Sequence, residues 1–257
     1  MGFKGAAVAT CIGRGIGVIF QLYHLFFGSR VIRLGIKNFK FIWPTIKKHL
    51  FVTGGSAGQH LITSSSWIVM ITIVAAFGSK VIAAYTIAFR IIAFTILPAW
   101  GIAMASATLV GQNLGAGEPD RAEKTVWKAA YYNMILLFII SVIAIIFANP
   151  IISIFTDDAE VLRYGVLGLR IIFVGYVFYA YEMVIGQSFN GAGDTYTPTI
   201  LNAICFWIIQ IPLAYFLGHY MGLASTGVFI AIAVSSCILA VMAIVVFRKG
   251  HWKQIEI

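Results

Sequence analysis

Residues 175–194 read Gly175-Tyr-Val-Phe-Tyr-Ala-Tyr-Glu-Met-Val-Ile-Gly-Gln-Ser-Phe-Asn-Gly-Ala-Gly-Asp194, a largely apolar stretch that carries one carboxylate inside it, Glu182. Of the nine acidic residues in the chain, the other eight fall in polar connections or near the C-terminus. An ionised carboxylate at membrane depth costs about 2.5–3.5 kcal/mol even on lenient insertion scales, so one that is retained there marks a candidate functional site. This interpretation requires that the segment crosses a membrane.

The composition indicates a membrane protein. Of the 257 residues, 60% are hydrophobic and 11% are charged, which is too little polar surface to cover a soluble globule. The net charge of +9 comes from basic residues between apolar runs rather than from one basic face, so we expect no nucleic-acid partner. No arrangement of nucleophile and base and no metal-ligand spacing is visible, so we expect no enzyme, cofactor or metal site.

Seven apolar runs are long enough to cross a hydrocarbon core of about 30 Å as helices. They lie at 5–27, 52–77, 83–110, 125–147, 165–186, 199–217 and 222–247. The runs are continuous rather than alternating, which favours helices over barrel strands. We therefore predict an all-α polytopic bundle of transmembrane helices. Pro98 and Pro212 lie inside runs, and we expect each to kink its helix because it removes a backbone donor.

Lysine and arginine accumulate after the first, third and seventh runs, which places those connections and the C-terminus in the cytoplasm of a bacterial-type inner (plasma) membrane. In segment 29–50 the basic residues recur mostly every three or four positions among apolar ones. This pattern predicts an amphipathic helix on the membrane surface, with an ordinary solvated linker as the alternative.

Two predicted cytoplasmic connections share a pattern of Gly-Gln, then Gly-Ala-Gly, then an acid. The copies are Gly111–Glu118 and Gly186–Asp194. Glycine permits the left-handed conformation that ends helices, and the acid suits the positive end of the next helix. A phosphate-binding loop would need Gly-Lys-Ser/Thr, which neither copy has, so we predict helix-ending turns.

These connections belong to two longer stretches that resemble the multidrug and toxin extrusion (MATE) transporters. One reads Leu97-Pro-Ala-Trp-Gly-Ile-Ala-Met-Ala-Ser-Ala-Thr-Leu-Val-Gly-Gln-Asn-Leu-Gly-Ala-Gly117, and the other begins Asn190-Gly-Ala-Gly-Asp-Thr-Tyr-Thr-Pro198. Members of that family are twelve-helix antiporters whose two six-helix lobes form a central cavity, and cation entry drives the export of organic cations.

The resemblance implies a division of this chain. Residues 51–247 resemble the six-helix C-terminal lobe, residues 1–28 the last helix of the N-terminal lobe, 29–50 the interlobe linker and 248–257 a cytoplasmic tail. The chain then looks N-terminally truncated, and full transport would need an N-terminal lobe.

Two positions depart from the family pattern. Family members often carry an acid in the first helix of this lobe, where this chain reads Gln59-His-Leu-Ile-Thr-Ser-Ser-Ser-Trp67. Many carry another acid one turn before Glu182, where this chain has Tyr179. Glu182 is therefore our candidate for ion coupling, because loss of water favours the neutral form of a carboxyl group and permits proton exchange. The alternative is a permanent ion pair with Arg14, Arg90 or Arg170.

Polar and aromatic side chains at helical spacing are candidates for lining a substrate cavity. They are Gln59, His60, Thr63, Ser66, Trp67, Arg90, Tyr179, Gln187, Asn190, Asn202, Phe206 and Gln210. Small and hydroxyl residues also hold membrane helices together, so packing remains the alternative for many of them. Tyr176, Tyr181 and the aromatic residues among the candidates would suit flat organic cations through cation–π contact.

We predict a secondary transporter that couples entry of a cation to export of amphipathic organic cations, with membrane lipids around it. The coupling ion is expected to be a proton or sodium, with the proton preferred because a sodium site would need further oxygen ligands beyond one visible acid. Two alternatives remain. One is a flippase for lipid-linked oligosaccharides in the same superfamily, and the other is an inactive half-transporter, because alternating access normally moves one repeat against another.

Overall fold

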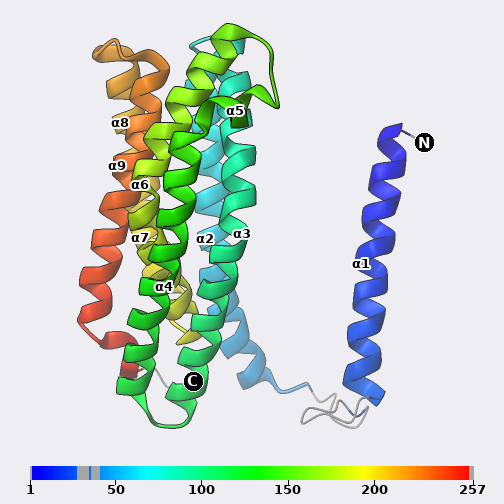
Figure 1. Cartoon of the computed structure of the whole chain (residues 1–257). Helices are drawn as coiled ribbons and strands as arrows, with labels where there is room; N and C mark the ends of the chain where they lie inside the picture. The colour runs from blue at the N-terminus through cyan, green and yellow to red at the C-terminus, as the bar shows by residue number, and fades with distance from the viewer. Residues whose placement is uncertain (1, 28–34, 36–40, 255–257) are drawn as a thin grey trace. The chain divides into compact units, whose positions relative to one another are not determined.

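The computed structural model describes residues 2–27, 35 and 41–254, and every regular element within them is helical (Figure 1). The elements are α1 (Gly2–Phe27), α2 (Trp43–Ala75), α3 (Ser79–Gly115), α4 (Pro119–Ile146), α5 (Ala148–Ser153), α6 (Ala159–Gly191), α7 (Tyr196–Asn202), the π-helical η2 (Ala203–Gln210), α8 (Ile211–Tyr215), the π-helical η3 (Phe216–Tyr220), α9 (Ala224–Arg248) and the 3₁₀ helix η4 (His251–Gln254).

Seven helical segments are long and apolar enough to cross a membrane, which confirms the predicted all-α polytopic fold. Several helices extend beyond the apolar runs because polar turns continue them. For example, α6 spans Ala159–Gly191 where the apolar run covers 165–186. The largest difference is α2, which begins at Trp43 rather than at residue 52.

The chain divides into two compact units, Met1–His49 and Leu50–Ile257, and each is described on its own. Half of the segment predicted as an amphipathic surface helix, 29–50, lies outside the described residues, and its last part forms the start of α2. The divisions of the chain implied by the family resemblance stay predictions.

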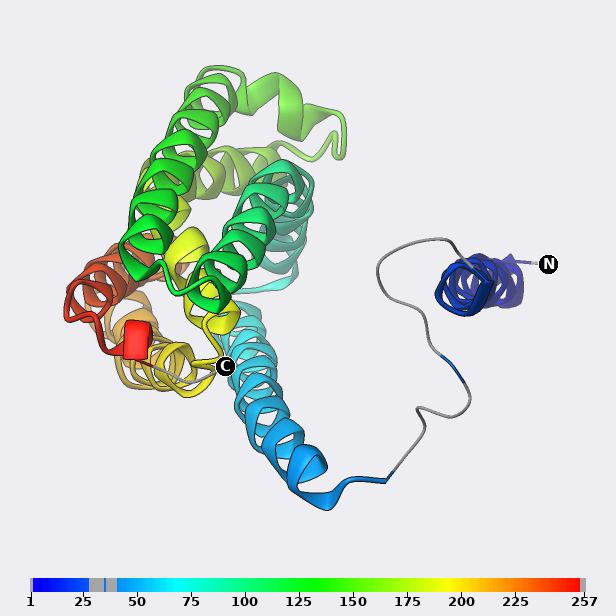
Figure 2. The same cartoon turned by 90° about the horizontal axis from the view of Figure 1, so that it is seen from below.

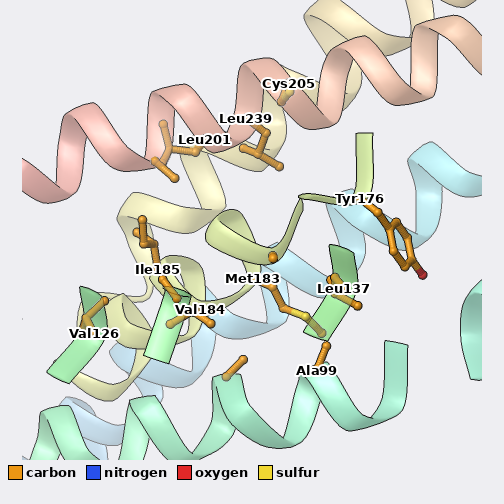
Figure 3. Close-up of a cluster of buried hydrophobic side chains, with 14 of the residues drawn as sticks. Ala99, Val126, Leu137, Tyr176, Met183, Val184, Ile185, Leu201, Cys205 and Leu239 are labelled. Carbon is orange, nitrogen blue, oxygen red and sulfur yellow. The ribbon is translucent and has the colours of Figure 1, made fainter. Parts of the chain in front are cut away.

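In the second unit α6 is the central helix, with contacts to α3, α4 and α9 (Figure 2). Figure 3 shows side chains of α3, α4, α6, α7 and α9 meeting in one buried cluster around Met183, Val184 and Ile185 of α6. This packing holds the half of α6 that carries Glu182.

The two repeated connections form the same helix-ending turn, which confirms the prediction from the sequence. Gly117 and Gly193 have φ of 75° and 81°, and the N–H groups of Glu118 and Asp194 donate to the carbonyls five residues back at 2.9 Å. The acids differ, however. The Asp194 carboxylate accepts from the Thr197 N–H at 3.0 Å, whereas the Glu118 side chain makes no capping hydrogen bond with a residue that the structure describes.

The two prolines occur in different backbone settings. Helix α3 continues as one element through Pro98. The last span but one is π-helical on both sides of the short α8 that contains Pro212. Single π turns inside α-helices are frequent at functional sites. The kinks expected at both prolines stay predictions.

We call the end of the second unit with connections 116–118 and 192–195 the predicted cytoplasmic end. There the indole of Trp252 is buried and stacks on Phe247 with ring centroids 4.7 Å apart. The Lys253 ammonium lies 3.0 Å from an Asp120 oxygen and 2.6 Å from a Glu123 oxygen. These hydrogen bonds, the one to Glu123 above all, raise the pKa of Lys253. The residues after α9 thus pack against the start of α4.

Candidate transport site

A cavity of about 460 Å³ lies beside the C-terminal half of α6, between that helix, α2, α3 and the span that begins with α7. We call it the Glu182 cavity. Its lining residues are Ser56, Gln59, His60, Thr63, Trp100, Met104, Tyr179, Glu182, Met183, Gly186, Gln187, Asn190, Asn202 and Phe206.

The carboxylate of Glu182 is half-buried and makes no hydrogen bond or ion pair with any residue that the structure describes. Arg90 and Arg170, two of the three cations considered as permanent partners, are both exposed. The third, Arg14, lies in the first unit and pairs with no acid among the described residues either. Gly186 leaves space at the carboxylate, because a Cβ there would lie 3.5 Å from Oε1.

Polar groups near the cavity differ in how far their hydrogen bonds are satisfied. The Asn190 amide donates to Gln187 Oε1 at 3.4 Å, while its own Oδ1 is buried without a partner in the described part of the chain. Thr63 donates to the Gln59 carbonyl of its own helix at 2.9 Å. The unpaired carboxylate in the wall of the cavity favours a positively charged occupant.

A second cavity of about 210 Å³ adjoins the first, and we call it the aromatic cavity. Both cavities are lined by Thr63, Tyr179 and Phe206, so these residues form a shared wall. The remaining lining residues are Ser66, Trp67, Met70, Tyr85, Phe89, Ile92, Ile96, Ile172, Gly175, Tyr176, Gln210, Ile232, Ala233 and Ser236.

Hydrogen bonds hold one ring of the aromatic cavity in place. The Tyr176 hydroxyl lies 3.0 Å from Thr95 Oγ1 and donates to the Ile92 carbonyl at 3.3 Å, which ties α6 to α3. Tyr179 stacks beside Tyr176 with ring centroids 6.0 Å apart. The fold therefore fixes the Tyr176 ring, and Tyr179 is stacked beside it.

Most of the cavity-lining candidates from the sequence come together in these two cavities. Gln59, His60, Thr63, Tyr179, Gln187, Asn190, Asn202 and Phe206 line the Glu182 cavity, and Ser66, Trp67 and Gln210 line the aromatic one. Arg90 lines neither and is exposed. Tyr181 packs against the hydrophobic core instead. Gln210 also joins helices, since its Oε1 accepts from Ser235 at 3.1 Å.

Sequence reasoning missed the contribution of α3. Trp100 and Met104 line the Glu182 cavity, and Tyr85 and Phe89 line the aromatic cavity. Each pair is spaced by four residues, which places its members on one helix face. That spacing was the available signal, but apolar residues occur all around α3, so the sequence did not indicate which face turns inward.

Known proteins resemble this chain along nearly its whole length. A sequence profile of the MatE family matches residues 56–216. The "Probable multidrug resistance protein NorM" of Thermotoga maritima is 26% identical over 255 residues, covering 99% of this chain and 54% of that protein. The "Uncharacterized transporter YisQ" of Bacillus subtilis is 23% identical, covering 99% of this chain and 56% of its own length.

Solved structures share the fold. A MOP superfamily transporter from Pyrococcus furiosus superimposes with a TM-score of 0.90 at 23% identity, covering 96% of this chain and 56% of that one. An outward-facing multidrug resistance MATE family transporter gives 0.89 at 23% identity, covering 95% and 55%. This chain thus spans about half the length of the relatives it matches. With the profile matching well over half of its residues, the chain belongs to the MatE family.

Proposed function

We propose that this chain supplies the Glu182-bearing lobe of a cation-coupled antiporter that exports amphipathic organic cations. The observation that carries the proposal is the unpaired Glu182 carboxylate in a cavity that adjoins an aromatic one. A carboxylate removed from water needs a proton or another cation. If a proton and an organic cation compete for this one carboxylate, entry of the proton releases the organic cation. Exchange of one for the other in this way is antiport.

The aromatic cavity supports the choice of substrate. Trp67, Tyr176 and Phe206 offer ring surfaces to a flat cation, and cation–π contacts contribute up to about 2 kcal/mol when desolvated. Neither cavity is lined by a lysine or arginine among the described residues. This favours a cationic drug over the anionic lipid-linked oligosaccharide of a flippase.

We further propose that transport requires a second lobe, that protons rather than sodium are coupled, and that the C-terminus lies in the cytoplasm of the bacterial plasma membrane. The relatives are about twice as long as this chain, and alternating access usually moves two repeats against each other. This lobe by itself would then bind substrate without moving it across a membrane.

The test is therefore binding rather than transport. Purified chain in detergent is titrated with tetraphenylphosphonium at several pH values, with and without sodium. We expect binding to strengthen as pH rises and the carboxyl group loses its proton, and protons to be released on binding. Glu182→Gln should remove both effects, whereas Glu118→Gln, in an exposed turn, should keep them. If binding by Glu182→Gln kept the pH dependence of wild type, the proposed role of Glu182 would be excluded. If sodium rather than protons competed with the organic cation, the coupling ion would be sodium.

A further inference from the structure

A third cavity, of about 440 Å³, lies between α5 and the first half of α6, and none of its lining residues belongs to the Glu182 or the aromatic cavity. Its lining residues are Asn149, Ala159, Leu162, Arg163, Val166, Leu167 and Arg170. Among the described residues, two arginines and no acid line this mostly apolar pocket, which lies at the end of the bundle opposite the C-terminus (Figure 1). An anion is the ligand that this lining attracts.

The two guanidinium groups are available to a ligand. Arg163 and Arg170 are seven positions apart, so both lie on one face of α6. Neither forms an ion pair with a described residue, and the nearby acids Asp158 and Glu160 are occupied by Lys80 at 3.6 and 2.7 Å. The positive charges of the two arginines are therefore available to a ligand from outside the chain.

One of the arginines is fixed by the fold. Arg170 Nε donates to the Ile145 carbonyl at 3.3 Å. Ile145 lies in the last turn of α4, where carbonyls have no partner within the helix. This bond uses one of the five guanidinium donors and leaves the planar edge of two nitrogens free for bidentate contact with a phosphate.

An apolar stripe continues along α6 from the arginines. Leu167, Val174 and Phe178 follow the same face and are 39%, 67% and 48% exposed. On α4, Ile143 and Ile146 are also exposed, at 51% and 62%. Exposed apolar side chains at this position in a membrane helix contact acyl chains. The positive charge of the arginines and the apolar stripe beside them together match a molecule with an anionic head group and apolar tails.

We propose that this pocket binds the phosphate of an anionic phospholipid, whose acyl chains lie along Leu167, Val174 and Phe178. Free phosphate has the same head chemistry, but it would not account for the exposed apolar stripe next to the arginines. The site is independent of the transport proposal, because it shares no residue with the cavities on which that proposal rests.

The test measures lipid binding by purified chain in detergent micelles containing phosphatidylcholine. Phosphatidylglycerol is titrated in, and retained lipid is counted by native mass spectrometry while the unfolding temperature is followed. We expect wild type to retain phosphatidylglycerol over phosphatidylcholine and to unfold at a higher temperature with it. Arg163→Gln and Arg170→Gln should each weaken apparent binding about fivefold. Arg90→Gln, an exposed arginine of α3 outside the pocket, should bind like wild type.

The same measurements can overturn the proposal. A double Arg163→Gln/Arg170→Gln variant that unfolds like wild type in phosphatidylcholine and still prefers phosphatidylglycerol would exclude the site. An arginine-dependent rise in unfolding temperature with inorganic phosphate alone would assign the pocket to a free anion instead. If the glutamine variants do not fold, the double lysine variant keeps both charges but loses bidentate geometry. It should bind more weakly than wild type, and equal binding would contradict the arginine-specific contact.

Discussion

The two halves of α6 place charged side chains in a membrane helix in opposite ways. The first half carries Arg163 and Arg170 at exposed positions, with Arg170 bonded to the end of α4. The second half directs Glu182 into a cavity between helices. A long arginine side chain can reach a helix end or a head group, whereas a short carboxylate stays at the depth of its backbone. Glu182 therefore needs a cavity between helices, whereas the arginines line a pocket at exposed positions near the helix end.

Close packing holds α6 in the one orientation that separates these two faces. A Cβ at Gly168 would meet the ring of Phe229, and one at Gly175 would lie 3.3 Å from the Ala233 carbonyl. A Cβ at Gly191 would meet the backbone of Ala107 in α3. The glycines let α6 approach α9 and α3 closely, and the following variants test how far its two faces depend on that packing.

Gly191→Val should have the largest effect. Its side chain would collide with backbone atoms, which cannot rotate away, so we expect a loss of at least about 3 kcal/mol and little folded protein. Gly101→Val is the control, because nothing lies within 4 Å of a Cβ there. The measurements are the yield of monodisperse protein and its unfolding temperature. Equal yields and unfolding temperatures for the two variants would show that α3 and α6 can move apart at their crossing without loss of stability.

Trp252→Ala should destabilise the end of α6 that carries Glu182. Trp252 is buried and stacks on Phe247, which packs edge-on against Phe189 of α6 at 5.7 Å. Removing a buried indole costs about 3 kcal/mol. Hydrogen exchange should speed up near residue 189 and stay unchanged near Arg163. Trp43→Ala, at an exposed position, serves as the control. Uniform exchange along α6 in the variant would contradict this local role.

Tyr176→Phe should have a smaller effect. The variant keeps the ring but loses the hydroxyl contacts with Thr95 and the Ile92 carbonyl, at a cost of about 1 kcal/mol. Because the ring borders the aromatic cavity, binding of a flat cation should weaken modestly. Tyr131→Phe, at an exposed position on α4, should change neither stability nor binding. If Tyr176→Phe were as stable as Tyr131→Phe, the hydroxyl contacts of Tyr176 would not contribute to stability.

Asp158→Ala should have the smallest effect, at the start of α6. The Val161 and Glu160 N–H groups lower the pKa of Asp158, with a further contribution from Lys80. A carboxyl group whose pKa is lower in the folded state stabilises the fold above its unfolded pKa of about 3.9. That stabilisation is lost as pH falls through the folded value. Wild type should therefore unfold at a higher temperature than Asp158→Ala at pH 7, with the difference shrinking below about pH 4.

The control for this comparison is Asp157→Ala, which alters the exposed neighbouring acid. Its unfolding temperature should follow that of wild type across the same pH series. A difference between wild type and Asp158→Ala that is constant with pH would show that the side chain acts through packing rather than through its charge.

Much of the fold follows from local patterns in the sequence. Long apolar runs identify the spans, and the Gly-Ala-Gly turns at Gly117 and Gly193 mark where α3 and α6 end. Glu182 stands out because it is an acid inside an apolar stretch. Features that depend on tertiary packing, such as which helix face lines a cavity, could not be predicted from the sequence. Trp100 lines the cavity, whereas Arg90, ten residues earlier on the same helix, does not.

The wall shared by the two cavities links their contents. Tyr179 and Phe206 face both spaces, so a ligand that displaces either ring in the aromatic cavity also reshapes the surroundings of Glu182 without touching it. Thermodynamic linkage then makes the influence mutual. The factor by which proton loss tightens ligand binding must equal the factor by which the ligand promotes proton loss. A single pair of rings can in this way convert the shape of a molecule into a change in protonation.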